Sequence, residues 1–349
     1  MEKRWKVGII GCGGIAQIHR DALLACPDAE ISAVCDVVRE RAESMAAAIA
    51  DADSENGPVE VFEDWHDLVS HPGLDAVHLC TPHFLHAEMA IGAMQAGLHV
   101  LTEKPMAISL ADAEAMNRVA GETGKRLGVC FQNRYNNTST RMRAVLASGR
   151  AGKVRGGRAI VTWNRGADYY GSGPWRGTWK EEGGGVMINQ AIHTLDLLQW
   201  MLGGNPVSLK GSMDTRLLSG IIEVEDVAEA LIRFENGVNG LFYATNSYCT
   251  DAPVQLEIVC EHAVMRLDDV LTIRYDDGET ETVAENDVAT GEKAYWGCGH
   301  KILVADWYRC MKTGEAFPID GHAAITALGL VLGLYESGRT GKLVTLQGV

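Results

Sequence analysis

Short runs of apolar residues alternate with longer amphipathic segments over the first 130 residues. The apolar runs predict strands at residues 5–10, 30–35, 59–62, 76–79, 99–102 and 126–130. Between most of them, apolar positions recur at helical spacing, which predicts helices at residues 16–25, 39–50, 83–96 and 110–123. Strand–helix alternation of this kind is typical of a parallel sheet covered by helices on both faces.

The pattern changes after about residue 130. It predicts a helix at 138–148, a strand at 154–163, a glycine- and tryptophan-rich loop at 164–185 and an apolar helix at 186–202. Asn236-Gly237 and Asp277-Gly278 each separate two strand-like runs, and such pairs favour hairpin turns because these turns need positive φ. Consecutive hairpins predict an antiparallel sheet, and helices near 300–312 and 321–337 follow it.

Composition narrows the function classes before any motif is considered. The 349 residues include 46 acidic and 31 basic side chains, a formal net charge of −15, so we expect neither nucleic acid nor an anionic membrane as a partner. The nine cysteines show no CxxC spacing, which favours free thiols in a reducing compartment. The apolar run near the N-terminus is too short for a signal peptide, and no stretch approaches a membrane span. We therefore expect a cytoplasmic protein.

The first apolar run leads into a glycine-rich turn, GCGGIA, at residues 11–16. Gly11 permits a tight turn, Gly13 lets the backbone approach a pyrophosphate, and the helix that follows offers its N-terminus to negative charge. Asp36, at the end of the second predicted strand, is placed to accept hydrogen bonds from a ribose 2′-hydroxyl. The spacing predicts a dinucleotide site, to which we assign Gly11, Gly13, Gly14, Ile15, Asp36 and Arg39.

The acidic residue also bears on the choice between NAD and NADP. Asp36 would repel a 2′-phosphate, whereas Arg39 and Arg41 could tolerate one. NAD is therefore the expected cofactor and NADP the less favoured alternative.

Another loop, TPHFLH, follows the fourth predicted strand and lies at the sheet edge where such folds bind ligands. We expect Thr81, Pro82 and His86 beside the cofactor, although an ordinary surface at a helix start would look the same. His83 and His86 are not expected to bind a metal, because no third ligand with suitable spacing follows. No metal site is expected elsewhere.

A lysine follows the fifth predicted strand in the sequence LTEKP, residues 101–105. The proline pushes the backbone of Lys104 toward an extended conformation, which would aim its side chain over the sheet edge. A lysine there can hydrogen-bond a substrate oxygen and offset charge that develops on it. The alternative is a solvated surface lysine paired with Glu103.

A polar stripe marks the apolar helix that begins after the glycine run at 183–185. Asn189, His193 and Asp196 recur at helical spacing, and histidine has a pKa suited to accepting a hydroxyl proton near neutral pH. A buried polar stripe must either be satisfied by hydrogen bonds or be functional, and both interpretations stay open. We read the glycines as allowing the chain to approach a ligand closely.

Taken in order, the four motifs resemble those of the Gfo/Idh/MocA oxidoreductase family, relatives of glucose–fructose oxidoreductase and inositol dehydrogenase. The resemblance covers nearly the whole chain, and the pairing of EKP with GGG and a following histidine makes it specific. It implies an α/β Rossmann dinucleotide-binding domain at 1–130, followed by an α+β domain at 131–349 with a large open, mostly antiparallel β-sheet. The sheet would form the interface of a homodimer or homotetramer, and the last helices could pack back on the first domain.

The resemblance also implies residue roles. Lys104 and His193 would form the catalytic pair, with His193 as the acid/base, and the EKP residues Glu103, Lys104 and Pro105 would line the nicotinamide side. Many family members carry Asp where this chain has Asn189. An amide can only hydrogen-bond and orient, so Asn189 is assigned to the catalytic residues in that role and not as a proton relay.

Further ligand contacts are expected where the two domains would meet. Gln132 follows the sixth predicted strand and is assigned to the cofactor. Aromatic rings stack on the apolar faces of sugars, and arginine donates to hydroxyls or phosphates. The substrate-binding set is Arg134, Tyr135, Trp163, Tyr170, Trp175, Arg176, Asn189 and His193. The alternative is that these aromatics seal a domain or subunit interface.

The expected function is an NAD-dependent dehydrogenase that transfers a hydride between the nicotinamide and a secondary hydroxyl or ketone. The substrate would be a sugar, glycoside, nucleotide sugar or inositol. One alternative is a redox-neutral enzyme that cleaves glycosides through a 3-keto intermediate. Another is a non-catalytic protein that senses sugar or NAD.

Overall fold

The computed structural model describes residues 4–52, 57–285 and 299–346. The chain forms two compact units, the first made of residues 1–132 and 299–324 and the second of residues 133–298 and 325–349. Their boundary crosses helix α10 (Gly321–Thr340), which begins in the first unit and continues in the second.

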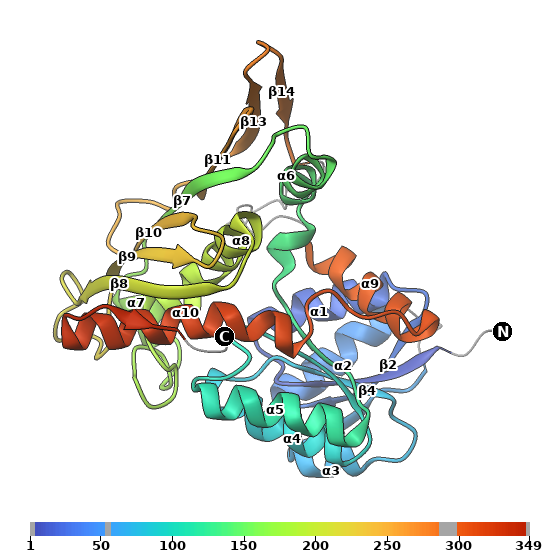
Figure 1. The fold of residues 1–349 in the computed structure, drawn as a ribbon. Coiled ribbons are helices and arrows are strands. Elements are labelled where there is room, and N and C mark those ends of the chain that lie inside the picture. The colour runs from blue at the N-terminus through green and yellow to red at the C-terminus, as the bar shows by residue number, and fades with distance from the viewer. Residues whose placement is uncertain (1–3, 53–56, 286–298, 347–349) are drawn as a thin grey trace. The chain divides into compact units, whose positions relative to one another are not determined.

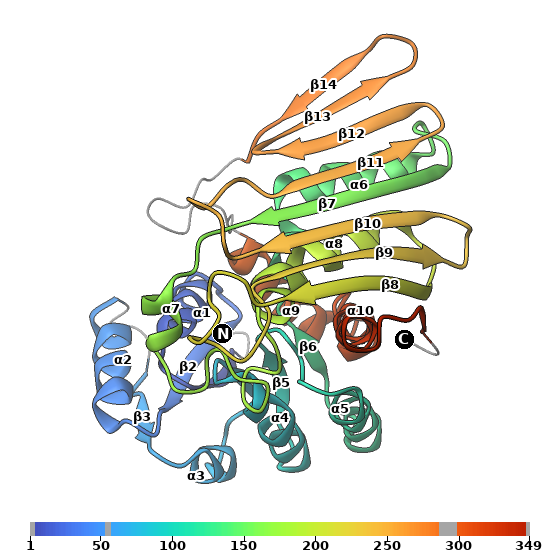
Figure 2. The ribbon, with the colours of Figure 1, turned by 90° about the vertical axis from the view of Figure 1, so that its left-hand side faces the viewer.

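The first unit is built on a six-stranded parallel sheet in the order β3-β2-β1-β4-β5-β6 (Figure 2). Its strands are β1 (Trp5–Ile10), β2 (Ala29–Cys35), β3 (Glu60–Phe62), β4 (Ala76–Leu79), β5 (His99–Thr102) and β6 (Leu127–Val129). The strands are nearly continuous apolar runs because helices cover both faces of the sheet. The predicted α/β class is confirmed.

Helices α1 (Gly14–Leu24), α2 (Arg39–Ala52) and α9 (Gly299–Thr313) lie on one face of this sheet. On the other face lie α3 (Trp65–Ser70), α4 (His86–Gln95) and α5 (Leu110–Thr123) (Figure 1). The strand order reverses between β1 and β4, so a crevice is expected at their carboxyl ends. Helix α3, capped by the Asp64 carboxylate on the amide of His66, was not predicted because six residues are too few to show a helical period.

The second unit holds a nine-stranded sheet in the order β14-β13-β12-β11-β7-β10-β9-β8-β15 (Figure 2). The pairing of β7 with β10 is parallel, and every other neighbouring pair is antiparallel. The strands are β7 (Val154–Thr162), β8 (Pro206–Asp214), β9 (Val227–Phe234), β10 (Asn239–Thr245), β11 (Gln255–Cys260), β12 (Ala263–Asp268), β13 (Val270–Tyr275), β14 (Thr280–Val283) and β15 (Val344–Thr345). The mostly antiparallel sheet and both hairpins, at Gly237 and Gly278, are confirmed.

Helices cover one face of the nine-stranded sheet. Helices α6 (Asn137–Ser148) and α8 (Ile192–Leu202) lie on this face, while α10 packs against β8, where Gly333 and Gly338 lie against Leu209 and Met213. A short helix, α7 (Ala167–Gly171), interrupts the loop before α8. Within the described residues no helix covers the opposite face, and none is long and apolar enough to cross a membrane.

Candidate functional site

The dinucleotide turn combines one tightly packed glycine with two open ones. Gly11 has φ +88°, and a β-carbon there would lie 2.7 Å from the carbonyl oxygen of Cys80. At Gly13 and Gly14 a β-carbon would meet nothing within 4 Å. Gly13 caps α1 without a side-chain hydrogen bond, and Ile15 is half-buried behind it. The glycines at this helix N-terminus therefore border open space, which fits the approach of a pyrophosphate group.

Asp36 is buried beside this turn. One carboxylate oxygen accepts the amide of Cys12 at 2.8 Å, and the other accepts the amide of Val38 at 2.9 Å. Arg39 forms ion pairs with Glu43 and Glu63, each at 2.8 Å. Because two carboxylates already balance its charge, Arg39 is poorly placed to neutralise a 2′-phosphate, and the arrangement fits NAD.

The TP loop lies next to the dinucleotide turn, because Gly11 packs on Cys80. Thr81 and Pro82 are half-buried, while His86 is fully buried. The ring nitrogens of His86 lie 2.7 Å from the carbonyl oxygen of Pro105 and 2.9 Å from that of Thr81. His86 therefore links the TP loop to the EKP loop.

Lys104 is half-exposed and precedes a cis peptide bond to Pro105. Glu103, beside it, is buried and turns into the unit, where Oε1 lies 3.0 Å from Nε2 of His19 and 3.5 Å from Nε2 of His300. Gln132 is also buried. Of the EKP residues, Lys104 is thus the one that is not fully buried.

The carboxylate of Glu103 ends a buried chain of polar groups. Nδ1 of His19 contacts Nδ1 of His78 at 2.8 Å, and Nε2 of His78 contacts the Tyr308 hydroxyl at 2.9 Å. Within the described residues, one group of donors suits a metal ion, His19, Glu103 and Cys130, whose ligand atoms lie within 4.8 Å of one another. Burial raises the pKa of the Cys130 thiol to about 12, so a neutral thiol stands beside the histidine–carboxylate pair.

In the second unit, the glycine run packs tightly against the chain itself. A β-carbon at Gly184 would lie 2.0 Å from the Tyr335 hydroxyl, and one at Gly185 would lie 1.9 Å from the carbonyl oxygen of Glu225. The Glu225 carboxylate accepts the amides of Gly185 at 2.9 Å and Met187 at 3.0 Å. These glycines thus seat the start of the next helix on buried neighbours.

A π-helical turn, Met187–Ala191, follows the glycines and leads into α8. Such turns are rare and recur at functional sites. It carries Asn189, whose amide donates to the buried Glu182 carboxylate at 2.5 Å and to the Tyr169 hydroxyl at 3.2 Å. His193 lies one turn further on and is half-buried.

Asp196, the third member of the predicted stripe, has a structural partner. Its carboxylate receives two hydrogen bonds from Arg134, at 2.7 and 2.5 Å, and both side chains are buried. The Arg134 guanidinium also lies over the Trp200 ring, 5.2 Å from its centroid. Arg134 therefore holds α8, which carries His193.

The remaining predicted substrate residues fall into two groups. Trp163 and Tyr170 are buried, with Trp163 donating to the carbonyl of Ala252 and the Tyr170 hydroxyl accepting from Asn246. Tyr135, Trp175 and Arg176 are half-buried. The Arg176 guanidinium lies 4.4 Å from the centroids of both the Trp175 and Tyr169 rings and donates to the Tyr169 hydroxyl at 2.5 Å.

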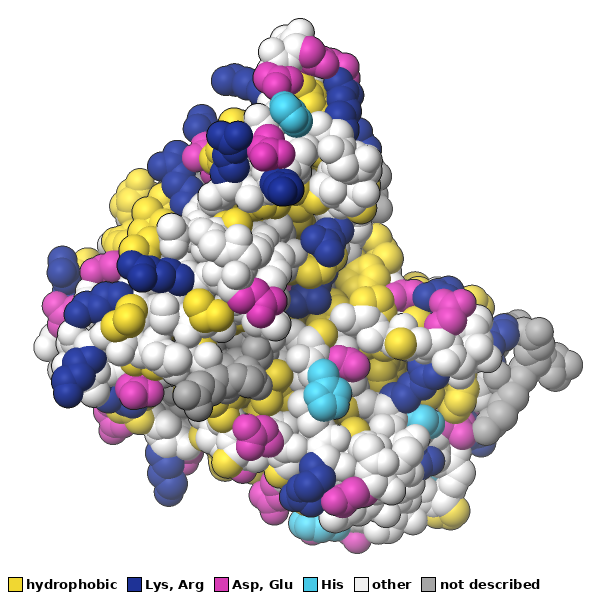
Figure 3. Space-filling view, in the orientation of Figure 1, with side chains coloured by type: hydrophobic (Ala, Val, Ile, Leu, Met, Phe, Trp, Pro, Cys, Tyr) yellow, Lys and Arg dark blue, Asp and Glu magenta, His cyan; other side chains and the backbone are white. Residues whose placement is uncertain are grey.

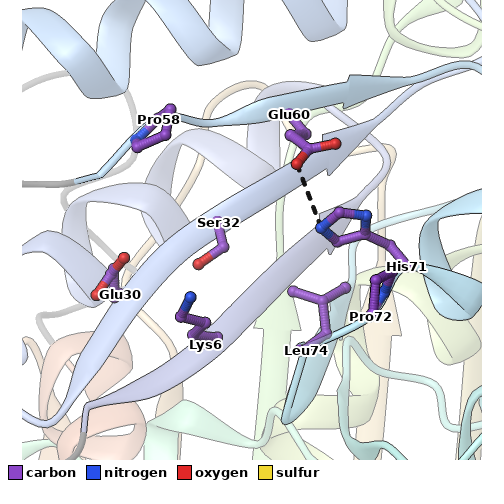
Figure 4. Close-up of a pocket in the computed structure, with 9 residues that line it drawn as sticks. Lys6, Glu30, Ser32, Pro58, Glu60, His71, Pro72 and Leu74 are labelled. Atoms are coloured by element: carbon purple, nitrogen blue, oxygen red, sulfur yellow. Dashed lines mark ion pairs between the residues drawn. The ribbon is translucent and has the colours of Figure 1, made fainter.

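A small cavity of about 130 Å³ lies at the amino ends of the first-unit strands, the edge opposite the dinucleotide turn (Figure 4). Lys6, Ser32 and an ion pair between Glu60 and His71, 3.4 Å apart, line it. It is separate from every residue predicted to bind the cofactor.

Two family models match consecutive parts of the chain. Residues 5–131 match the oxidoreductase family with an NAD-binding Rossmann fold, and residues 139–266 match the GFO/IDH/MocA C-terminal domain. The chain belongs to the Gfo/Idh/MocA oxidoreductase family. The resemblance inferred from the four motifs and the expected cofactor, NAD, are thereby confirmed.

Similar proteins of this kind act on several substrates. A 1,5-anhydro-D-fructose reductase from Ensifer adhaerens is 30% identical over 69% of this chain and 68% of its own. A D-apiose dehydrogenase from Paraburkholderia graminis is 27% identical over 99% of this chain and 91% of its own. The WlbA dehydrogenase from Bordetella pertussis, solved with NADH and UDP-GlcNAcA, superposes with a TM-score of 0.83 at 28% identity and covers 99% of both chains.

Sequence reasoning missed several buried groups in this Gfo/Idh/MocA oxidoreductase. They are His19, His78, His300 and Tyr308 in the first unit, and Glu182, Glu225 and Tyr335 in the second. An isolated histidine, tyrosine or glutamate in the sequence gives no signal of its own when its partner lies far away along the chain. The predicted roles of the site residues remain predictions.

Proposed function

We propose that this protein is an NAD-dependent oxidoreductase that transfers a hydride between the nicotinamide and a secondary hydroxyl or ketone of a sugar, glycoside, nucleotide sugar or inositol. The open N-terminus of α1 beside the buried Asp36 carries the proposal, because it fits a dinucleotide and leaves a 2′-phosphate disfavoured. The three similar proteins, a reductase and two dehydrogenases, support the substrate class.

In the proposed reaction, bound NAD⁺ supplies the acceptor for the hydride. His193 takes the proton of the substrate hydroxyl while the carbon–hydrogen bond on the same substrate carbon breaks. Lys104 hydrogen-bonds the substrate oxygen as this oxygen becomes a carbonyl. Asn189, whose side-chain amide donates to Glu182 at 2.5 Å, orients the π-helical turn that leads into α8, which carries His193. The products are a ketone, NADH and a proton, and reduction runs through the same groups in reverse.

Arg176 and Trp175 are the proposed substrate contacts that the geometry favours most. The guanidinium lies over the ring and is half-buried, an arrangement that leaves donors at its edge. Tyr135 is half-buried and joins them in the proposal. For Trp163 and Tyr170, which are buried, we propose that they shape the site from behind.

We also propose that the protein is a homodimer or homotetramer that assembles through the nine-stranded sheet. On its uncovered face Leu231 and Leu241 are direct cross-strand partners and are 45% and 50% exposed. Tyr243 and Ile160 pair two residues further along, and hydrophobic side chains gather on this face, at the left of Figure 3. A continuous apolar strip flanked by charged side chains fits a self-complementary interface.

A cytoplasmic location is proposed on the state of the thiols. Every cysteine within the described residues is free, and seven of the eight are buried. Free thiols persist in reducing compartments.

The test is absorbance at 340 nm with NAD⁺ or NADP⁺ over free sugars, inositols, glycosides and nucleotide sugars. We expect continuous NADH formation with at least one of them, and a preference for NAD⁺. Glycoside cleavage without net NADH would instead support the redox-neutral alternative. Tight binding of a sugar and NAD without either reaction would support a sensing protein.

A further inference from the structure

The backbone of Lys104 is tied on both sides by buried side chains. Its amide donates to Oε2 of Glu103 at 3.1 Å. The carbonyl of the next residue, Pro105, faces Nδ1 of His86 at 2.7 Å. A carbonyl oxygen can only accept, so Nδ1 of His86 donates in this contact, while burial lowers the pKa of the ring. Neither tether belongs to the side chain that would meet a substrate.

The first tether is itself anchored deep in the unit. Oε1 of Glu103 lies 3.0 Å from Nε2 of His19 on α1 and 3.5 Å from Nε2 of His300 on α9. A carboxylate can only accept hydrogen bonds, so Nε2 of His19 carries a proton. Helices α1 and α9 thus hold a side chain of the EKP loop from the same face of the sheet.

The charges around Glu103 are consistent with this anchor. Burial alone would raise the pKa of Glu103, but the hydrogen bond from His19 and the proximity of His300 hold this pKa well below its ordinary value. Burial alone would lower the pKa of His19, but the Cys80 and Cys130 thiols beside its ring raise that pKa well above the ordinary value. Burial, and after it the proximity of His19, lowers the pKa of His78, whose Nδ1 lies 2.8 Å from Nδ1 of His19. The result is a buried histidine–carboxylate pair with a second histidine, His78, behind it.

We propose that Glu103 and His86 are positioning residues that fix the backbone of Lys104 from both sides, with His19 and His300 anchoring Glu103. A lysine side chain has four rotatable carbon–carbon bonds, so its ammonium can be aimed only if the backbone that carries it is fixed. The catalytic consequence rests on the proposed function of Lys104. The tethers themselves are a property of the fold and can be tested without a substrate.

The first experiment measures hydrogen exchange of the Lys104 amide by mass spectrometry of fragments spanning 102–106, in which Pro105 contributes no amide. In Glu103→Ala we expect this amide to exchange at least tenfold faster than in the unmodified protein. The matched control is Glu60→Ala, which removes a carboxylate from another glutamate–histidine pair, at the opposite edge of the same sheet (Figure 4). Unchanged exchange in Glu103→Ala would overturn the tether.

The second experiment asks whether the tethers serve the reaction. With the sugar that the unmodified protein turns over fastest, we expect kcat to fall at least tenfold in Glu103→Ala and in His86→Ala. The Kd for NADH, measured by fluorescence, should stay within twofold, and Glu60→Ala should match the unmodified protein in both. Faster amide exchange with unchanged kcat would overturn the positioning role. Absence of hydride transfer in the unmodified protein would count against the proposed function, and the exchange result would still decide the tether.

A second variant and a metal analysis test the proposal independently of Glu103→Ala. If Glu103→Ala does not fold, His86→Ala tests the second tether alone through exchange at Met106, beyond Pro105, where we expect acceleration of at least tenfold. Metal analysis of the purified protein is expected to find no stoichiometric ion. One zinc per chain bound by His19, Glu103 and Cys130 would replace the histidine–carboxylate pair with a metal site and overturn the proposal.

Discussion

Adding one methyl group at Gly13 should abolish NAD binding without unfolding the protein. Gly13 has φ −76° and ψ −164°, which alanine adopts without strain, and a β-carbon there meets nothing within 4 Å. That open space is where a pyrophosphate would approach the N-terminus of α1. The matched variant is Gly11→Ala, because Gly11 has φ +88° and a β-carbon there would lie 2.7 Å from the Cys80 carbonyl oxygen.

The two variants are expected to differ in stability, although both should lose affinity for NADH. At Gly13, replacing glycine at the helix cap by alanine destabilises the folded state by about 0.5–1 kcal/mol. Alanine also lowers the conformational entropy of the unfolded chain, which stabilises the protein by a similar amount, so the free energy of unfolding should change by under about 1 kcal/mol. At Gly11, the left-handed backbone alone costs roughly 1–2 kcal/mol, and the backbone clash adds to it. Displacing the pyrophosphate from two amide donors should cost at least about 2.7 kcal/mol of binding, a hundredfold in Kd.

Fluorescence titration with NADH and a urea denaturation curve measure the two effects side by side. We expect Gly13→Ala to keep the urea midpoint and lose NADH binding at least a hundredfold, whereas Gly11→Ala lowers the midpoint as well. Wild-type affinity for NADH in Gly13→Ala would refute the reasoning, because the open space would then not be the pyrophosphate site.

Three further predictions concern the rest of the site. Lys104→Ala should lower kcat at 340 nm by roughly 10²–10³, with the Kd for NADH within twofold, and wild-type turnover would remove Lys104 from the mechanism. Asp196→Asn should destabilise the protein by roughly 3–5 kcal/mol in urea, because it removes the carboxylate charge that faces the buried Arg134 guanidinium, and an unchanged midpoint would contradict this. Burial raises the pKa of Glu225 from 4.5 to about 7, so between these values the unfolded state binds fewer protons than the folded state. Stability should therefore fall as pH rises through that range, by at most about 1.4 kcal/mol per unit, and a urea series in Glu225→Gln that kept this slope would contradict the assignment.

The sequence predicted those parts of the fold that depend on neighbouring residues. The dinucleotide turn, the TP loop and the EKP loop each follow a strand, so local periodicity placed Gly11, Thr81 and Lys104 at strand ends. The hairpins at Gly237 and Gly278 were predicted for the same reason, since the turn residues themselves require positive φ.

Contacts between distant residues could not be predicted in this way. His19 and His300 meet at Glu103 across most of the chain, and nothing near either histidine in sequence indicates a carboxylate partner. The partner of the glycine run at 183–185 also could not be predicted from the sequence around it. Its composition indicated a close approach, but whether to a ligand or to Tyr335 depends on a helix about 150 residues away.

The most direct test of the proposed hydride transfer follows a deuterium label from the substrate to the cofactor. The substrate is a sugar found in the absorbance screen, with deuterium on the carbon that bears the reacting hydroxyl. It is incubated with the protein and NAD⁺, and the masses of both products are measured by mass spectrometry. The account predicts one deuterium on the nicotinamide of the reduced cofactor for each ketone formed, and none transferred by Lys104→Ala on the same timescale. Ketone formation with the deuterium released to water would contradict it.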